Sequence, residues 1–384
     1  MGGHYIRGCL GRELWIDVLK LDLRTGLRPS LDGLPVPVGR GDLVTCSEKE
    51  NSELFHGVLG GLGQFGIITR ARIALEPAPK RVRWIRVLYS NFTAFTNDQK
   101  YLISLHDVHP SKSFDYVEGF VVVDEGLINN WRSSFFSPRN PVKISSIGTK
   151  GGVLYCLEMT KNYDESNADS LDQEVDALLK ELDFLPATDF TTDLPYVDFL
   201  DRVHRAEVKL RAKGLWEVPH PWLNLFVPGS RILDFDRGVF RGILGNKTSG
   251  PILIYPVNKH KWDERSSVVT PNEEVFYLVA FLRTAVPDSV EPSQQLEYLS
   301  HQNQRILDFC NDAAIDIKQY LPNYSTLDDW RRHRGSCDEK RSSIPGASLA
   351  LAREYSGLNH HLLCLIRPDS LGGLQIIDNF VVTF

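Results

Sequence analysis

The stretch Gly60-Gly61-Leu62-Gly63-Gln64-Phe65-Gly66 contains the pattern G-x-G-x-x-G, the fingerprint of dinucleotide-binding folds. That fingerprint binds a pyrophosphate only where it follows a strand and opens a helix, because the helix amides then face the phosphates. Here the order is reversed. A helical pattern over Asn51 to Leu59 precedes the glycines, and a strand pattern from Ile67 to Glu76 follows them. The sequence therefore argues against a Rossmann domain.

The elements on either side of the glycines follow from side-chain periodicity. One helix face carries apolar residues, namely Leu54, Phe55, Val58 and Leu59. Ser47 and Glu50 have the spacing of a capping box, which predicts that the helix begins there. Two interpretations of the glycine run remain open. It is either a turn that needs positive φ and close packing, or backbone that lies against a ligand in another architecture.

Composition excludes several classes of protein. The chain has 384 residues, of which 42% are hydrophobic and 24% charged, as in a soluble globular protein of one or two domains. Its net charge is −6 and it has no basic patch with interleaved aromatic residues, so we expect no nucleic-acid partner. No apolar run approaches the ~18 residues of a membrane span, and residues 1–7 lack the apolar core of a signal peptide.

Cysteines and histidines give no metal-binding pattern. The six cysteines include no C-x-x-C pair, so we predict no zinc site. His360 and His361 are adjacent and point in different directions on any regular element. Three N-x-S/T sequons begin at Asn91, Asn246 and Asn323, which hints at a glycoprotein of secretory origin.

The chain divides into three segments. The prolines in Glu76-Pro77-Ala78-Pro79-Lys80 end regular structure, so we predict domains at 1–79 and 80–321, followed by a divergent tail at 322–384. Strands and helices alternate in the middle segment without a regular βαβ repeat, which predicts an α+β fold. The expected strands are 116–123, 153–159, 251–257 and 274–283, and the expected helices are 169–182, 196–213 and 294–314.

Common catalytic motifs are missing, but two stretches could form a binding site. The sequence contains no G-x-S-x-G, P-loop or H-E-x-x-H motif. The stretch 214–228 holds two Trp, three Pro and a Phe, and it is either a core-lining loop or one wall of a pocket for a planar ring. Tyr255 to Trp262 is a similar candidate, a strand that ends in a loop with an amide, cations and an indole. Glu158 ends a strand pattern and is either a solvated rim charge or a carboxylate that holds an amine or ring N–H.

Several stretches of the sequence resemble a known family. Glu53-Leu54-Phe55, the run from Val58 to Ile73, Trp216 to Pro228, Phe235-Asp236-Arg237-Gly238-Val239-Phe240 and Tyr255 to Trp262 resemble the plant cytokinin dehydrogenases. These are FAD enzymes of the vanillyl-alcohol-oxidase type. The resemblance runs from about Glu13 to about His333. It implies part of a VAO/PCMH-type FAD-binding domain and a substrate cap domain with an antiparallel sheet covered by helices.

The resemblance also implies an activity and a set of site residues. Members of the family oxidise the N6 side chain of isoprenoid cytokinins, giving adenine and an aldehyde. Ile68 and Tyr320 would contact FAD. Glu158 would hydrogen-bond the adenine, Leu321 would contact the substrate, and Trp262 would line the pocket with Asn258 close by. Family members are often extracellular, whereas oligomeric state and localisation are not predicted for this chain.

The sequence departs from the family pattern at three places. Gly3-His4 is followed by Tyr5 and does not match the Gly-His-Ser motif that carries the covalent flavin histidine. The Trp-Thr-Asp-Tyr-Leu segment with the catalytic aspartate has no counterpart between Ser30 and Gly39, and the closing Pro-Gly-Gln motif is also unmatched. No catalytic residue is therefore assigned. We expect a truncated or aberrant family member, from an incomplete gene model or a short isoform. The alternative function is an inactive fragment that binds an adenine-type ligand or a protein.

Overall fold

A computed structural model describes residues 15–21, 28–29, 35–36, 41–61, 67–72, 78–105, 110–123, 152–245, 250–287, 289–291 and 295–320. These residues fall into two compact units. Unit 1 comprises the described parts of Pro77–Lys259 and Thr270–Tyr320. Unit 2 comprises the described parts of Tyr5–Glu76 and the inserted segment His260–Val269.

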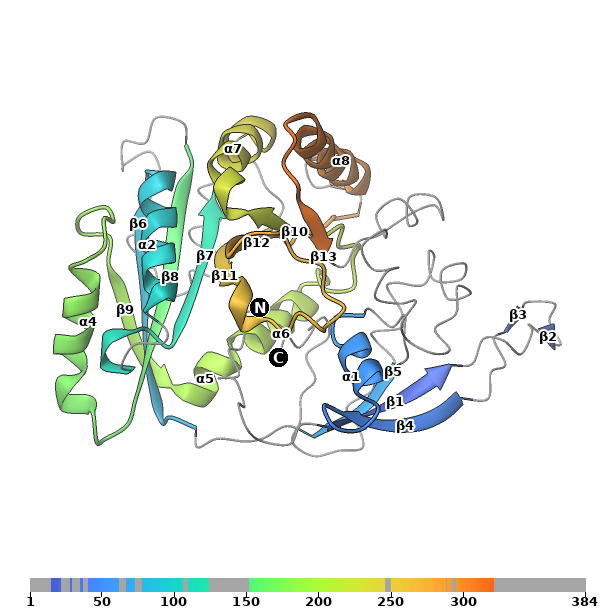
Figure 1. Ribbon diagram of the computed structural model, residues 1–384. Coiled ribbons are helices and arrows are strands. Elements are labelled where there is room, and N and C mark those ends of the chain that lie inside the picture. Colours follow the sequence, from blue (N-terminus) through green and yellow to red (C-terminus); the bar gives the residue numbers. More distant parts are fainter. Residues whose placement is uncertain are drawn as a thin grey trace. The chain divides into compact units, whose positions relative to one another are not determined.

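Unit 1 is built on an eight-stranded antiparallel sheet with the order β13-β10-β12-β11-β7-β8-β6-β9 (Figure 1). The strands are β6 (Arg81–Tyr89), β7 (Tyr116–Val122), β8 (Leu154–Tyr163), β9 (Phe190–Pro195), β10 (Leu223–Pro228), β11 (Ile252–Asn258), β12 (Val275–Phe281) and β13 (Lys318–Tyr320). The central strands are buried on both faces, which explains why their sequences read as apolar runs with little alternation.

One face of this sheet is covered by helices, and we call it the helix-covered face. The helices that pack on it are α2 (Phe92–Ser104), α4 (Leu171–Leu179), α7 (Ile232–Phe235), a π-helix (Asp236–Ile243) and α8 (Leu296–Asp312). They bury Phe95, Val175, Phe235 and Ile306 against strand residues that include Tyr155. This cluster is the main core of the unit. Short 3-10 turns complete the connections at Pro110–Lys112, Ala168–Ser170, Gly229–Arg231 and Lys259–Lys261.

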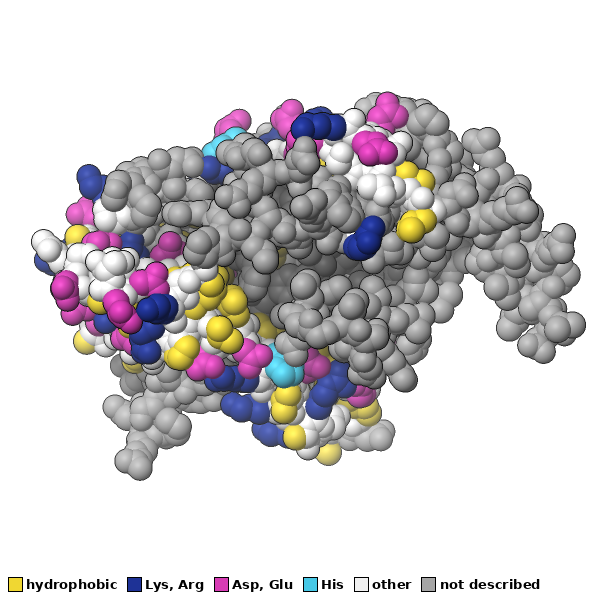
Figure 2. Space-filling view, turned by 90° about the horizontal axis from the view of Figure 1, so that it is seen from below, with side chains coloured by type: hydrophobic (Ala, Val, Ile, Leu, Met, Phe, Trp, Pro, Cys, Tyr) yellow, Lys and Arg dark blue, Asp and Glu magenta, His cyan; other side chains and the backbone are white. Residues whose placement is uncertain are grey.

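The opposite face, which we call the Glu158 face, has a smaller apolar cluster that includes Leu88, Phe120 and Leu253. Helices α5 (Tyr196–Leu200) and α6 (Arg202–Ala212) follow β9, and Phe199 of α5 packs on Trp84 of this face. The described surface seen from below carries Lys and Arg interspersed with Asp and Glu around hydrophobic side chains (Figure 2). Among the described residues, no helix is both long and apolar enough to span a bilayer.

Unit 2 contains a three-stranded antiparallel sheet with the order β4-β1-β5. Its strands are β1 (Trp15–Leu21), β4 (Gly41–Ser47) and β5 (Ile67–Arg72), and a small pair is formed by β2 (Arg28–Pro29) and β3 (Pro35–Val36). Helix α1 (Ser52–Val58) precedes Gly60, whose φ is +71°. The inserted segment packs on α1, since Ser267 Oγ donates to the Gly57 carbonyl at 2.7 Å and Ser267 N donates to the Leu59 carbonyl at 3.0 Å.

Several predictions made from the sequence are confirmed. The fold is α+β, the large sheet is antiparallel and helix-covered, and the order helix, glycine turn, strand holds. Gly60 is needed twice, because its φ is left-handed and an added Cβ would lie 2.1 Å from Val268 Cγ2. Residues 62–66 of the glycine run lie outside the described residues. So do 73–77, the end of the predicted strand, and 321–384, which contain the predicted tail.

Two details of the prediction were wrong. The predicted capping box does not form, because Ser47 ends β4 and its Oγ accepts from the amides of Lys49 and Glu50 in a local turn. Helix α1 begins at Ser52, close to the predicted Asn51, which itself has φ +49°. The predicted helix 196–213 is two helices, because the chain turns at Asp201, between α5 and α6. The Ser47 side chain holds a local turn in place of a helix start, and periodicity alone does not show this.

Candidate functional site

A buried group of charged side chains lies on the Glu158 face, across the three neighbouring strands β6, β8 and β7. Arg86, Glu158 and Glu118 occupy one row, since Arg86 pairs with Glu158 in the register of β6 and β8, and Glu118 pairs with Glu158 in that of β7 and β8. Each is only 1% exposed. Arg86 Nε donates to Glu158 Oε2 at 2.7 Å, and Nη2 lies 2.6 Å from the same oxygen. We call these three residues, with Tyr116 and Arg202, the carboxylate cluster.

Tyr116 and Arg202 connect Glu118 to helix α6. The Tyr116 hydroxyl donates to Glu118 Oε2, and Arg202 Nη2 donates to the Tyr116 hydroxyl at 3.2 Å. The Arg202 guanidinium lies 3.9 Å from the centroid of the Phe199 ring. Glu158 thus binds Arg86 directly, while the Tyr116 hydroxyl links Glu118 to Arg202.

Aromatic rings enclose the cluster. The Arg86 guanidinium lies 4.7 Å from the centroid of Trp84 and 5.3 Å from that of Phe120. Such cation–π contacts are worth about 2 kcal/mol when they are desolvated. The site therefore combines fixed negative charge with flat apolar surface.

Burial and charge shift the pKa values of the two groups nearest Glu118. Desolvation, followed by the charge of Glu118, raises the pKa of Tyr116 well above its usual value of 10.0, so the hydroxyl stays protonated and keeps donating. Burial opposes the charge on Arg202, but Tyr116 and the carboxylates of Glu158 and Glu118 outweigh it and raise the pKa of the guanidinium. Tyr116 is therefore a fixed donor and Arg202 a fixed cation.

Sequence reasoning found Glu158 but missed Arg86, Glu118, Tyr116 and Arg202. The signal was present in part, because Arg86 and Glu118 are charged residues inside apolar strand patterns, and such residues are seldom buried unless they are paired. Their pairing depends on the order of β6, β8 and β7, which the sequence does not show. The interpretation of Glu158 as a solvated rim charge is wrong, since its side chain is 2% exposed.

Tyr320 lies on the same face of the sheet as Glu158. It pairs with Asn224 of β10 in a row that continues through Ala280, Leu253 and Phe120. The Tyr320 ring stacks on Phe226, with centroids 5.2 Å apart and planes inclined by 29°. Burial raises the pKa of its hydroxyl above the usual value.

The other predicted site residues lie elsewhere. Asn258 ends β11 with its amide directed to the helix-covered face, where Nδ2 donates to the Ile103 carbonyl of α2 at 3.3 Å. It does not share a face with Glu158, and its role beside the pocket stays a prediction. Ile68 and Trp262 belong to unit 2, in β5 and in the inserted segment. Ile68 is 37% exposed, and Leu321 lies outside the described residues.

The aromatic stretch before β10 is not a core-lining loop. Trp216, His220 and Trp222 are each partly exposed, and their rings form a row. The centroid of the His220 ring lies 6.1 Å from that of Trp216 and 5.8 Å from that of Trp222. His220 Nε2 lies 2.9 Å from the Trp216 carbonyl, which only accepts, so this nitrogen carries the proton. Thr284 Oγ1 lies 3.3 Å from His220 Nδ1 and fixes the other side of the ring.

Within the described residues, no group of three His, Cys, Asp or Glu side chains could hold a metal ion. The described thiols are buried, and burial raises the pKa of Cys310 to about 12. The interactions observed in the carboxylate cluster are hydrogen bonds and ion pairs, which suit recognition of a polar ligand.

Comparison with known proteins gives a consistent result. The family model described as "Cytokinin dehydrogenase 1, FAD and cytokinin binding" matches residues 79–341, which include the carboxylate cluster. Cytokinin dehydrogenase 5 of Arabidopsis thaliana is 63% identical over 357 residues, covering 85% of this chain and 65% of the relative. Cytokinin dehydrogenase 5 of Oryza sativa subsp. japonica is 63% identical over 370 residues, covering 88% and 69%.

The chain spans about two thirds of the length of these curated relatives. Among solved structures, Physcomitrella patens BBE-like 1 is similar with a TM-score of 0.46 and 12% identity, covering 87% of this chain and 63% of that one. The assignment rests on the sequence relatives and the family model. The chain belongs to the cytokinin dehydrogenase family, a family of FAD-dependent oxidoreductases.

Proposed function

We propose that this chain binds isoprenoid cytokinins on the Glu158 face and, with FAD, oxidises their N6 side chain to give adenine and an aldehyde. One observation carries the proposal: the buried row Arg86, Glu158 and Glu118, enclosed by aromatic rings, lies inside the region that matches the family model. Burying an ion costs several kcal/mol. Groups of buried, paired charges in a protein are typical of sites where charge serves recognition or catalysis.

The chemistry of the cluster suits a purine. An adenine is planar and offers ring N–H and exocyclic N–H donors, which carboxylate oxygens accept. Arg86, Glu158 and Glu118 are buried, and a charge-assisted hydrogen bond is stronger in buried surroundings than in solvent. Arg86 holds Glu158 in place, while Tyr116 and Arg202 hold Glu118. We propose that Glu158 accepts from the adenine and that Glu118 shares this role.

The proposed FAD contacts are Ile68 and Tyr320. When bound, FAD accepts the hydride from the carbon next to the amine. Ile68 offers an exposed apolar side chain on β5, and Tyr320 offers a ring already ordered by Phe226, so both suit contact with a flavin. We further propose that Leu321 and Trp262 contact the substrate. We also propose that Asn258, whose amide is held by α2, lies close to the bound substrate.

A second function, binding without turnover, is favoured by a specific observation. No Gly-His-Ser motif and no Trp-Thr-Asp-Tyr-Leu segment is found in the sequence, so the covalent flavin histidine and the proton-accepting aspartate have no counterpart. A positioned general base contributes about 10²–10⁴-fold to the rate. Under this alternative the chain binds an adenine-type ligand and leaves it unchanged.

A flavin spectrum separates the two functions. The purified chain is incubated with FAD, desalted, and its visible absorbance is recorded before and after anaerobic addition of isopentenyladenine. Retained yellow absorbance that bleaches on addition supports oxidation. Retained or absent absorbance without bleaching, together with calorimetric binding of isopentenyladenine, supports binding alone. A chain that neither retains FAD nor binds isopentenyladenine contradicts both.

A further inference from the structure

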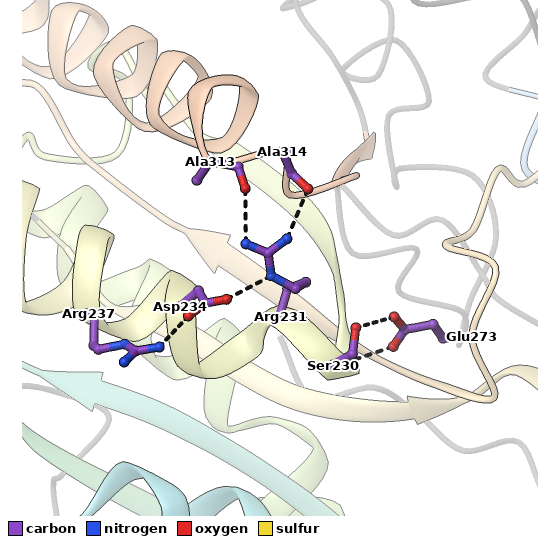
Figure 3. Close-up of polar contacts among 7 residues, drawn as sticks. All are labelled: Ser230, Arg231, Asp234, Arg237, Glu273, Ala313 and Ala314. Carbon is purple, nitrogen blue, oxygen red and sulfur yellow. Dashed lines mark hydrogen bonds and ion pairs between the residues drawn. The ribbon is translucent and has the colours of Figure 1, made fainter.

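Arg231 closes the carboxyl-terminal end of α8, although it lies 82 residues earlier in the chain than Ala313. Its Nη2 donates to the Ala313 carbonyl at 2.9 Å and its Nη1 to the Ala314 carbonyl at 3.1 Å (Figure 3). Its Nε donates to Asp234 Oδ2 at 2.7 Å. The planar guanidinium therefore donates three hydrogen bonds, two to carbonyls and one to a carboxylate.

The helix end that Arg231 binds is a Schellman motif with an unusual residue. Ile315 N donates to the Cys310 carbonyl at 2.8 Å and Ala314 N to the Asn311 carbonyl at 3.0 Å, which are the two bonds of that motif. Ile315 and Cys310 are both buried, which supplies its usual hydrophobic contact. The left-handed position, normally a glycine, is Ala314 with φ +50°. A side chain there costs about 1–2 kcal/mol.

Arg231 offsets that cost. The carbonyl of Ala313, the C-cap residue of α8, lacks a partner within the helix and lies at the negative end of the helix dipole, so a cation bound there is favourable. The second bond, to the Ala314 carbonyl, holds the left-handed residue that follows the helix. Asp234 orients the guanidinium and lies between Arg231 and Arg237. Next to Arg231, Ser230 N donates to Glu273 Oε2 at 2.9 Å, which anchors this turn to the segment before β12.

The turn fixed by Arg231 leads directly to Tyr320. Only five residues separate Ala314 from Tyr320, and Lys318–Tyr320 form β13. Strand β13 pairs with three residues of β10, and β10 ends at Pro228, three residues before Arg231. The same segment thus supplies both the strand on which β13 pairs and the arginine that fixes where β13 begins. An edge strand of three residues has few hydrogen bonds of its own to set its register.

We propose that Arg231 is a positioning residue for Tyr320. By holding the Ala313 and Ala314 carbonyls it fixes the register of β13 on β10, which keeps the Tyr320 ring stacked on Phe226. The functional part of this inference rests on the proposed function, in which Tyr320 contacts FAD.

Hydrogen exchange of the full chain tests the positioning role without any ligand. The variants are Arg231→Met, Arg231→Lys and, as a matched control, Arg237→Met, whose arginine binds the same Asp234 but no carbonyl of α8. We expect amides in 313–320 to exchange about tenfold faster in Arg231→Met, with a smaller increase in Arg231→Lys. Arg237→Met and the strands β7 and β8 should be unchanged. Unchanged exchange in 313–320, or an equal increase throughout unit 1, would overturn the proposal.

Titration of the same proteins with FAD, followed by flavin fluorescence, tests the functional part. We expect Arg231→Met to bind FAD about fivefold more weakly than the wild type, and Arg237→Met to bind it equally well. Equal affinity of Arg231→Met and wild type overturns the link to the flavin. If the wild-type chain binds no FAD, the proposed function fails and the link between Arg231 and the flavin fails with it. The exchange measurement then still decides whether Arg231 positions β13.

Discussion

Arg86 and Glu158 show how a single pair of residues constrains the proposed site. Both are almost fully buried, and Arg86 donates twice to one oxygen of Glu158. Removing one partner leaves a buried charge without its counterion. Replacing both with apolar side chains removes the charges and their desolvation cost together. The pair is therefore expected to contribute more to recognition than to net stability.

This difference is measurable by urea unfolding. We expect Arg86→Met to lower the free energy of unfolding by about 3–5 kcal/mol, because Glu158 then stays buried and uncompensated. The double variant Arg86→Met, Glu158→Leu should recover most of that loss. If the double variant is less stable than Arg86→Met, the pair is a net source of stability, contrary to this account.

His56 makes the stability of unit 2 depend on pH. Its ring is buried in α1, 3.6 Å from Asp263 Oδ2, and Arg265 and Glu48 also face it. Burial and then the charge of Arg265 lower its pKa below the ordinary 6.5. The unfolded chain therefore binds a proton more readily than the folded chain. The stability that neutral His56 contributes is complete above pH 6.5 and is lost as pH falls from there towards the lowered pKa.

Thermal unfolding at two pH values tests whether stability falls as the pH is lowered. Between about pH 7.5 and about pH 5.5, the Tm of the wild type should fall by about 2 °C more than that of His56→Phe, which has no titrating group at this place. His204→Gln is the control, since His204 is partly exposed and belongs to α6 of unit 1. A wild type and His56→Phe with parallel pH profiles would show that His56 does not titrate differently on folding.

At the scale of the elements, one residue at the end of α8 has a backbone conformation that is unfavourable for its residue type. Ala314 occupies a left-handed position, so Ala314→Gly should raise the free energy of unfolding by about 0.5–1 kcal/mol. Ala313→Gly serves as its matched control, because φ at Ala313 is −82° and glycine there should only add flexibility to the unfolded chain. Two equal effects of the same sign would mean that the strain at Ala314 is not what the substitution relieves.

The elements were predictable from the sequence to different degrees. Helix α8 and strands β11 and β12 were found because their apolar side chains recur with clear periods. Strand β6 was not predicted, since Arg83 and Arg86 interrupt its apolar residues and their partners lie 72 to 110 residues away. Strand β13 was missed because three residues carry too little pattern.

At the scale of the whole molecule, the sequence indicated the family and the sheet, and it located one member of the carboxylate cluster. The remaining members come together only through the strand order β7-β8-β6 and the packing of α5 and α6, which are long-range features. Alternation assigns neighbouring residues to opposite faces of a strand, but it does not tell which face holds the site, so the role of Asn258 stays a prediction.

The central claim is that the Glu158 face binds an N6-substituted adenine, and calorimetric titration of the full chain with isopentenyladenine tests it most directly. The account predicts saturable one-to-one binding by the wild type. Glu118→Gln should weaken it about 10- to 100-fold, because a hydrogen bond to a charged group is lost. The control Glu165→Gln, whose carboxylate is 90% exposed, should bind as the wild type does. No binding by the wild type, or equal affinity of Glu118→Gln and wild type, would contradict the claim.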